Sequence, residues 1–374
     1  MSISFFLKIS NNAFMLKDVY NVELVDRSFG SCGYNAAKKP RLDSSKTLLD
    51  NMGHLIPIYV LSDASKNRLF NGIIRRVNIL FSIYGFYRKC LKIKDSIVFM
   101  QYPFLQLSPY GRFFLLKHLK SNGNKIIYLV HDLDSVRYNK LKMLHVEQKE
   151  LLLADICIVH SFPMLIHLNQ LGISVKHSVI LKFFDYRLQY SFPKQRDLRD
   201  IKLVFAGNLE KSHFLRQLDR VDWDKNVYLF LYGSWSDNVV INDRIFYKGK
   251  FSPNNIEEVE GNWGLVWDGE SINTCVGLYG NYLKINAPFK MSMYLAANLP
   301  VIVWGKSAMA EYVKLYNIGI CIDSLNEIPN KIMSLTDMQI NEIKHNVKCI
   351  SEKIRCGGML SEALAESIYI LNHD

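Results

Sequence analysis

The feature that most constrains the fold is a repeated alternation of short apolar runs with longer segments of helical character. Several of these runs are apolar throughout, without a polar residue at every second position. Such runs are typical of strands in a parallel sheet that helices cover on both faces. The chain therefore predicts an α/β fold of two tandem, Rossmann-like, doubly wound parallel sheets. The expected strands cover residues 20–25, 55–61, 96–100, 125–130, 155–160 and 178–181, then 202–206, 227–232, 244–247, 263–267, 301–304 and 318–322.

The length of the chain also favours two domains. A chain of 374 residues exceeds the usual size of a single hydrophobic core. We expect an N-terminal domain over residues 1–195 and a C-terminal domain over residues 196–350, joined by the polar stretch 191–200. The remaining residues, 351–374, are expected to form a helix that crosses back to the first domain. A helical pattern over 337–371 is interrupted at Gly357 and Gly358.

Composition excludes several classes of protein. No apolar run is long enough for a membrane-spanning helix, and the first residues lack the basic region and cleavage site of a secretory signal. The seven cysteines are scattered and form no CxxC pair, which favours a reducing cytoplasm over a disulfide framework or a zinc site. Neither a GxGxxG nor a GxxxxGK[ST] motif is present, so a nicotinamide enzyme or a P-loop ATPase is not indicated.

The positive charge of the chain is concentrated in its first half. Residues 1–200 hold 29 Lys and Arg against 15 Asp and Glu, whereas the rest holds 17 against 20. This asymmetry points to an anionic partner. No zinc-finger, RNP or helix-turn-helix pattern supports nucleic acid, and we expect none. The basic, aromatic segment 71–94 is either a domain helix with basic ends or a surface that lies on an anionic membrane.

Polar and glycine residues follow several of the expected strands. In an open parallel sheet, ligands bind beyond the carboxyl ends of the strands. The sequence therefore predicts a ligand site in a cleft where the strand ends of the two domains meet. Glycines there allow close approach of a ligand, or simply turn the chain. The residues concerned are 207–211, 233–235 and 268–271 in the second half and 131–134 in the first.

One helix is expected to begin in the stretch INAPFKMSMYLAANLPVIVW. Proline is favoured at a first helical position, so we expect Pro288 there, with Asn286 or Ala287 as the cap. Lys290 then falls in the first turn, where the helix dipole disfavours a cation unless an anion is near. A phosphate bound by Lys290, Lys211 and the free N–H groups explains this arrangement.

The stretch HDLD at residues 131–134 allows three interpretations. Asp132, or His131 as second choice, is a candidate general base facing the cleft, and His160 is a weaker one. Asp132 and Asp134 together form a weaker candidate for a divalent metal site. Asp132 as a helix cap beside a structural histidine is the third interpretation. The loop 271–282 is either a lid over the site or a surface excursion.

Four stretches resemble the carboxyl half of GT-B glycosyltransferases. They read VFAGNLEKSHFL, GLVWDGES, YLKINAPFKMSMYLAANLPVIVW and NIGICIDSLNEI, with ISEKIRCGG resembling the family's last crossing helix and KIIYLVHDLD a match in the first half. The resemblance is to bacterial β-1,6-galactofuranosyltransferases of O-antigen assembly and to a glucosyltransferase group that extends adhesin glycans. A Gly-x-Lys-Ala loop of that family corresponds to residues 33–36, which lack the lysine. The ribose-binding glutamate of other GT-B enzymes corresponds to Met293.

The resemblance implies a fold, a reaction and a set of site residues. It implies a GT-B glycosyltransferase that transfers a hexose, most readily galactofuranose from UDP-galactofuranose, with inversion and without metal or cofactor. Asp132 is the implied base, followed by His131. The implied donor-binding residues are Gly207, Asn208, Lys211, Gly233, Trp235, Asp268, Gly269, Lys284, Asn286, Lys290 and Ser292, and the acceptor side involves Gly33, Tyr34 and Asn35.

Alternatives to this function stay open at the level of sequence. The same scaffold also suits transfer of glucose from UDP-glucose, or a glycosyltransferase-like protein that binds a glycan or partner without turnover. The expected partners are a nucleotide-sugar donor and a lipid-linked glycan acceptor, with a homo-oligomer as a further option. We expect a cytoplasmic protein in peripheral contact with the inner face of the membrane.

Overall fold

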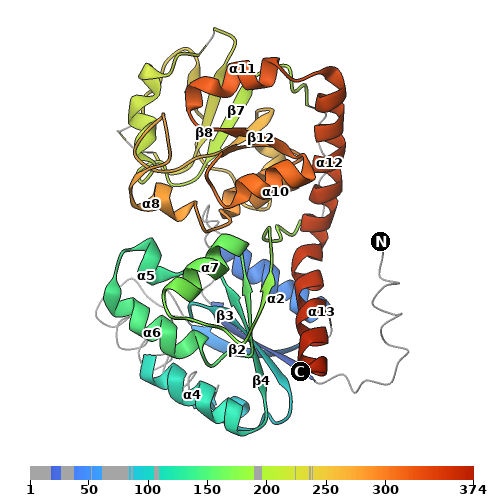
Figure 1. Cartoon of the computed structure of the whole chain (residues 1–374). Helices are drawn as coiled ribbons and strands as arrows, with labels where there is room; N and C mark the ends of the chain where they lie inside the picture. Colours follow the sequence, from blue (N-terminus) through green and yellow to red (C-terminus); the bar gives the residue numbers. More distant parts are fainter. Residues whose placement is uncertain are drawn as a thin grey trace, which may run out of the picture.

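The structure is a computed structural model, in which two α/β domains lie one above the other (Figure 1). It describes residues 18–26, 38–51, 53–60, 84–85, 87–104, 109–188, 196–223, 225–235, 237 and 239–374. The expected acceptor-side residues Gly33, Tyr34 and Asn35 lie outside these ranges, as do residues 191–195 of the expected linker and most of the segment 71–94.

The N-terminal domain contains a six-stranded parallel sheet in the order β2-β1-β3-β4-β5-β6. Its strands are β1 (Val19–Asp26), β2 (His54–Val60), β3 (Ile97–Tyr102), β4 (Lys125–Val130), β5 (Ile156–Val159) and β6 (His177–Ile180). All six expected runs of the first half form strands. Every residue of β3 and β5 is buried, as expected for strands covered on both faces.

The C-terminal domain contains a second six-stranded parallel sheet, in the order β12-β11-β10-β7-β8-β9. Its strands are β7 (Lys202–Ala206), β8 (Tyr228–Tyr232), β9 (Ile245–Tyr247), β10 (Trp263–Val266), β11 (Val301–Trp304) and β12 (Gly319–Ile322). The strand order reverses between β7 and β10, which is where ligands bind in doubly wound sheets. The prediction of two tandem parallel sheets is therefore confirmed.

Helices cover the sheets and line the boundary between the domains (Figure 1). Among the described residues, the α-helices of the N-terminal domain are α2 (Lys39–Asp50), α4 (Pro109–Ser121), α5 (Asp134–Arg137), α6 (Leu141–Leu151) and α7 (Phe162–Gln170). Those of the C-terminal half are α8 (Gly277–Tyr282), α9 (Phe289–Ala296), α10 (Met309–Tyr316), α11 (Ile328–Met333), α12 (Asp337–Cys356) and α13 (Gly358–His373). Because α8 occupies the end of the stretch 271–282, the prediction of an irregular loop there is wrong for its second half.

The last two helices connect the domains. Thr336 and Gln339 form a capping box that starts α12, and α12 ends at Gly357, whose φ of 86° favours glycine. The chain then turns into α13, which packs against β6 and α2 of the N-terminal domain. The carboxylate of Asp185 accepts hydrogen bonds from the backbone N–H groups of Met359 and Leu360 and so caps α13 from outside the helix. The predicted break at Gly357 is confirmed.

Candidate functional site

Lys290 lies at the point where the C-terminal sheet reverses its strand order. It is the second residue of α9, and its Nζ lies 2.9 Å from Oδ2 of Asp268 and 3.2 Å from the carbonyl oxygen of Trp267. The ammonium also lies 4.4 Å from the ring centroid of Phe205, a cation–π distance. These contacts hold the cation above the carboxyl ends of β7 and β10. The ion pair is partly exposed, so an incoming anion can reach it.

The start of α9 differs from the expectation in one respect. Pro288 is the N-cap residue with extended backbone, and the helix begins at Phe289, so proline is not at the first helical position and Asn286 is not the cap. No side chain caps this end, which leaves backbone N–H groups of the first turn available to a ligand. Oδ1 of Asn286 is buried and has no hydrogen-bond partner among the residues that the structure describes.

The two strand-end glycines, Gly207 and Gly233, have different roles. A β-carbon added at Gly207 would meet nothing nearer than Lys290 at 3.8 Å, so the space beside it faces the lysine. A β-carbon added at Gly233 would lie 2.1 Å from the carbonyl oxygen of Gly207. Gly233 is therefore required by the packing of β8 against β7, whereas a β-carbon at Gly207 would make only ordinary van der Waals contact with Lys290 and Phe205.

The loop after β7 is held by its own polar groups. Oδ1 of Asn208 accepts from the backbone N–H of Lys211, which fixes a turn, and the Lys211 ammonium lies 5.6 Å from the ring centroid of Tyr279. The Ser212 hydroxyl donates to the Asn208 carbonyl over 2.9 Å, and its oxygen lies 3.3 Å from Oδ1 of Asp268. Asp268 thus lies between this loop and Lys290, while Lys211 is directed toward α8.

The other expected donor-binding residues are spread around this centre. Trp235 is half exposed at the end of β8, where its ring packs against Tyr247. Gly269 allows the backbone of Val276 to approach closely, since an added β-carbon would lie 2.2 Å from that carbonyl oxygen. Lys284 donates to Asn281, and Ser292 is buried in α9. Of the expected donor-binding residues, Gly207 and Asp268 lie directly beside Lys290.

Asp132 lies just beyond the end of β4 in the N-terminal domain and contacts Tyr282 of the C-terminal domain. Its Oδ2 forms an ion pair with Arg137, and its Oδ1 accepts a hydrogen bond from the Tyr282 hydroxyl over 3.3 Å. Burial raises the pKa of Asp132 above its ordinary value, although the positive charge of Arg137 opposes the rise. The N-cap of α5 is Leu133, so the interpretation of Asp132 as a helix cap is wrong.

His131 is buried and held in one tautomer. The side-chain amide of Gln101 donates to the Arg41 carbonyl and to Ser45, so its oxygen accepts from Nε2–H of His131 over 2.7 Å. Burial and the nearby Arg41 charge lower the pKa of His131 well below its ordinary value. The imidazole of His131 is therefore neutral, and its Nδ1 remains as an acceptor.

His160 joins the two domains. Its Nε2–H donates to the Val130 carbonyl over 2.7 Å, and its Nδ1 accepts from the backbone N–H of Ala287 over 3.0 Å. Both ring nitrogens are occupied and the side chain is buried, and burial lowers the pKa to about 4. Because both nitrogens are bonded, His160 has none free to act as a base. Its two hydrogen bonds instead connect the end of β4 to the segment that leads into α9.

Four functional residues were missed by sequence reasoning. They are Arg41, Gln101, Arg137 and Tyr282. Arg137 carried a signal, since it lies five residues from Asp132 at the end of a short helical pattern. Gln101 lies in β3, next to the end of β4, whereas Arg41 and Tyr282 reach the strand ends from distant parts of the chain; no local pattern marks these three residues.

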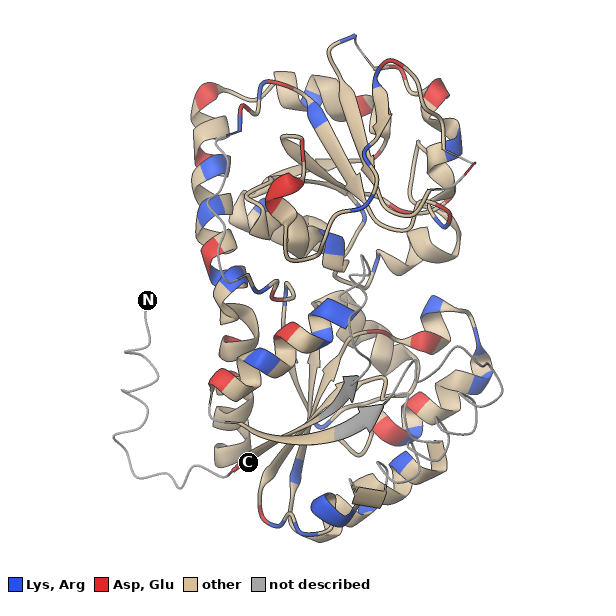
Figure 2. Ribbon diagram, turned by 180° about the vertical axis from the view of Figure 1, so that it is seen from behind, with Lys and Arg blue, Asp and Glu red and all other residues tan. Residues whose placement is uncertain are grey.

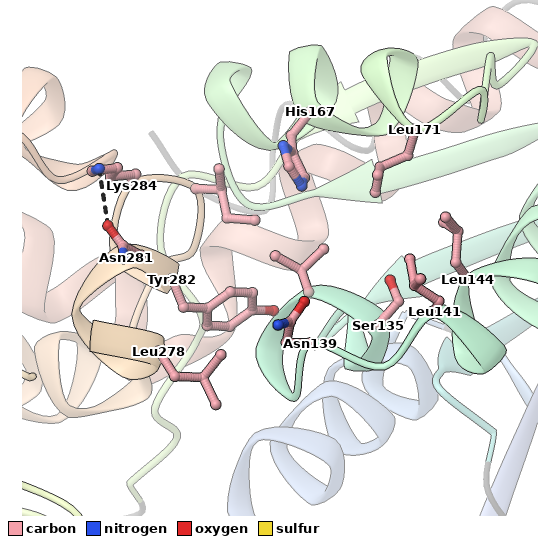
Figure 3. Close-up of a pocket in the computed structure, with 12 residues that line it drawn as sticks. Ser135, Asn139, Leu141, Leu144, His167, Leu171, Leu278, Asn281, Tyr282 and Lys284 are labelled. Carbon is pink, nitrogen blue, oxygen red and sulfur yellow. Dashed lines mark hydrogen bonds between the residues drawn. The ribbon is translucent and has the colours of Figure 1, made fainter. Parts of the chain in front are cut away.

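A cavity of about 510 Å³ lies between the domains beside Tyr282 (Figure 3). Its N-terminal wall comes from α5, α6 and α7, and its C-terminal wall from α8 and the residues that follow. Such a volume suits a small ligand. The lining residues are Ser135, Val136, Asn139, Leu141, Leu144, His167, Leu171, Leu278, Asn281, Tyr282, Lys284 and Ile285.

Two further properties bear on ligands and membranes. Among the described residues, no group of three His, Cys, Asp or Glu side chains is arranged to hold a metal ion, and Asp132 instead pairs with Arg137. None of the helices in the described part of the chain has the length and apolar character needed to cross a bilayer.

Two family models match the chain and together span most of it. The model for the N-terminal domain of glucosyltransferase 3-like proteins matches residues 25–183, and the model for their C-terminal domain matches residues 203–367.

Two curated proteins share sequence with both halves. The chain is 32% identical over 312 residues to the beta-1,6-galactofuranosyltransferase WbbI of Escherichia coli K12, which covers 80% of this chain and 87% of that protein. It is 24% identical over 259 residues to glucosyltransferase 3 of Streptococcus parasanguinis, which covers 68% of this chain and 73% of that protein.

Solved structures of glycosyltransferases share the fold. Sucrose-phosphate synthase from Thermosynechococcus elongatus aligns with a TM-score of 0.60 at 12% identity, over 96% of this chain and all of that one. The lipopolysaccharide outer core galactosyltransferase WaaB aligns with a TM-score of 0.54 at 13% identity, over 95% of this chain and 99% of that one. At such identities the likeness concerns the fold, which is that of GT-B glycosyltransferases.

Proposed function

Because the chain belongs to the glucosyltransferase 3-like family of glycosyltransferases, we propose that it transfers galactofuranose from UDP-galactofuranose to a sugar hydroxyl of a surface-polysaccharide intermediate. The observation that carries the choice of sugar is the similarity to a beta-1,6-galactofuranosyltransferase, which extends over 80% of the chain at 32% identity. The site geometry agrees with a nucleoside diphosphate donor in the second domain and an acceptor that touches the first.

The donor diphosphate binds at Lys290 and the first turn of α9. The uncapped N–H groups and the ammonium supply positive potential on one side, and the space beside Gly207 admits the phosphates. Asp268 holds Lys290 in place and offers a carboxylate oxygen to the ribose, since Met293 replaces the glutamate that binds ribose in other GT-B enzymes. No metal is required, because these groups neutralise the leaving diphosphate.

The transfer proceeds as a single displacement with inversion. The acceptor hydroxyl oxygen forms a bond to the anomeric carbon as the bond from that carbon to the phosphate oxygen breaks. The hydroxyl proton passes to the Asp132 carboxylate, and the negative charge passes to UDP, where Lys290 stabilises it. A raised pKa suits this role, because it makes the Asp132 carboxylate a stronger base than that of an exposed aspartate.

Transfer of glucose from UDP-glucose is the second candidate. The family description and the 24% identity to a streptococcal glucosyltransferase 3 favour it. The two candidates share the diphosphate site and differ in the pocket for the sugar ring.

A panel of donors tests both candidates. The purified protein is incubated with UDP-galactofuranose, UDP-galactopyranose, UDP-glucose or UDP-N-acetylglucosamine, each with a glycan acceptor, and UDP release is measured. We expect release from UDP-galactofuranose, abolished by Asp132→Asn. Release from UDP-glucose alone would replace the first candidate by the second, and release from neither would contradict both.

A lipid-linked acceptor places the enzyme at a membrane, and one face of the N-terminal domain suits contact with an anionic bilayer. Tyr84, Tyr110 and Phe114 are 64%, 88% and 66% exposed, and the Tyr87 hydroxyl donates to the Gly111 carbonyl, which places Tyr87 beside α4. Residues 84–121 contain seven Lys and Arg but one acid, Asp95. Blue segments lie along α4 at the bottom of the N-terminal domain in Figure 2. Exposed aromatics among basic groups are typical of interfacial surfaces.

Vesicle sedimentation tests this contact. We expect binding to vesicles with anionic lipid, weakened by the double substitution Tyr110→Ser and Phe114→Ser. Tyr369→Ser is the matched control, because Tyr369 is also 64% exposed but lies on α13. Equal binding to neutral and anionic vesicles, or equal effects of both changes, would contradict the proposal.

A further inference from the structure

The segment that leads into α9 is hydrogen-bonded to the strand ends of the N-terminal domain. The backbone N–H of Leu133 donates to the Tyr282 hydroxyl over 2.9 Å, and Ser161 donates to the Ile285 carbonyl over 2.7 Å. The Ala287 N–H donates to His160. Residues 282–287 therefore form a bridge between the ends of β4 and β5 and the helix that carries Lys290. We call these residues the bridging segment.

Tyr282 is the member of the bridging segment that contacts the candidate base. Its side chain is buried, and its hydroxyl accepts from Leu133 N–H, so the hydroxyl proton is free to be donated. The Oδ1 atom of Asp132 lies 3.3 Å away and is the acceptor. The carboxylate is thus held at both oxygens, at Oδ1 by Tyr282 and at Oδ2 by Arg137.

We propose that Tyr282, a residue of the donor-binding domain, positions Asp132 of the other domain as the general base. This inference rests on the proposed function, in which Asp132 accepts the proton of the acceptor hydroxyl. Two directional contacts fix the plane of the carboxylate, and fixed orientation of a base is part of its effect on rate. Because only the six residues 283–288 separate Tyr282 from α9, the base is aligned where the domains are held together for donor binding.

The hydrogen bond also controls the charge of Asp132. A donated hydrogen bond stabilises the carboxylate, so Tyr282 lowers the pKa of Asp132, as Arg137 and Arg41 do, while burial and the neighbouring carboxylate of Asp134 raise it. Loss of the Tyr282 hydroxyl alone leaves the other four influences in place. The pKa of Asp132 then rises, and the acid limb of the pH–rate profile moves to higher pH.

The test is Tyr282→Phe, which keeps the buried ring and removes the hydroxyl. We expect kcat to fall by roughly ten- to a hundredfold with little change in the KM for donor, and the acid limb of kcat/KM to move to higher pH. Tyr312→Phe is the matched control. Tyr312 is also a buried tyrosine of the C-terminal domain, but it has no influence on Asp132. We expect no movement of the acid limb in this variant.

A second readout separates the inference from the proposed function. The protein is labelled with ¹³C at the aspartate carboxyls, and the Asp132 resonance is identified by its loss in Asp132→Asn. Its midpoint should lie at higher pH in Tyr282→Phe than in the wild type, whether or not a donor is consumed. An unchanged midpoint, or an unchanged kcat and acid limb, overturns the role of Tyr282. Absence of UDP release from the wild type with a shifted midpoint overturns the proposed function alone.

Discussion

The ammonium of Lys290 lies 2.9 Å from a carboxylate oxygen of Asp268, so the first turn of α9 is bound to the end of β10 by an ion pair. The pair is only partly exposed, and the lysine contacts the Trp267 carbonyl and the face of Phe205 as well. A cation restrained in this way needs little rearrangement to bind a phosphate.

Replacement of Lys290 by alanine should weaken UDP binding. The change removes a charge-assisted hydrogen bond and leaves Asp268 facing the phosphates, so we expect the Kd for UDP to rise by roughly ten- to a hundredfold. Titration calorimetry measures the change, and the thermal shift produced by UDP should shrink in parallel. Lys344→Ala, at an exposed position on α12, is the control. If Lys290→Ala and the wild type bind UDP with equal affinity, the diphosphate does not bind at Lys290.

Substitution by alanine should affect UDP binding at Gly207 but the stability of the fold at Gly233. Gly207→Ala places its methyl group 3.8 Å from Lys290, so the Tm should hold while the UDP-induced shift falls. Gly233→Ala places its methyl group 2.1 Å from the Gly207 carbonyl oxygen, so the fold itself should be destabilised by roughly 1–3 kcal/mol. Thermal melts with and without UDP separate the two. A normal UDP response in Gly207→Ala would show that the ligand does not use this space.

His160 should make the protein sensitive to acid. The folded state keeps His160 neutral down to about pH 4, whereas in the unfolded chain it takes up a proton near pH 6.5. The stability that this neutral histidine contributes is therefore present above about pH 6.5 and is lost as the pH falls toward 4, by about 3 kcal/mol in total. Urea unfolding at pH 7.5 and 4.5 measures the loss.

The contribution of His160 is obtained by difference, because Asp185 and other buried carboxyls titrate in the same range with the opposite sign. Burial raises the pKa of Asp185 to about 7. His160→Gln should lose less stability than the wild type between the two pH values, although it starts from a lower value. Equal losses in both proteins would contradict the assignment of a neutral His160.

Gly357→Ala should destabilise the junction of α12 and α13. Its φ of +86° is strained for alanine, and the methyl group would lie 2.5 Å from the Thr47 hydroxyl oxygen of α2. We expect a loss of about 2 kcal/mol or more. Gly249→Ala is the control, because its φ of +81° gives the same backbone strain and its methyl group meets nothing within 4 Å. If Gly357→Ala loses no more stability than Gly249→Ala, the contact of residue 357 with α2 does not contribute to the loss.

Much of the fold could be predicted because the information is local. The twelve strands among the described residues follow from apolar runs of a few residues, and the break between α12 and α13 follows from two adjacent glycines. Periodicity and backbone permissiveness act within one element and are visible along the chain. The start of α9 was located to within one residue, and the error arose because Pro288 caps the helix with extended backbone.

The candidate site was predictable only in part. The strand ends after β4, β7 and β10 were found because parallel strands place their carboxyl ends at one edge. Sequence reasoning did not show that Gly233 serves packing, that His160 has both nitrogens occupied, or that Lys211 is directed toward Tyr279. Each of these depends on which side chain occupies the neighbouring space.

The two sheets, the positions of their strand ends and the family of the chain follow from the amino-acid sequence alone. Which groups meet at those strand ends depends on the three-dimensional fold, since Asp132 and Tyr282 are separated by 150 residues and His160 and Ala287 by 127. The physical reason is that a hydrogen bond forms between groups that are close in space, whatever their separation along the chain. Contacts between two domains therefore have no linear pattern, whereas the periodicity of a strand or helix does.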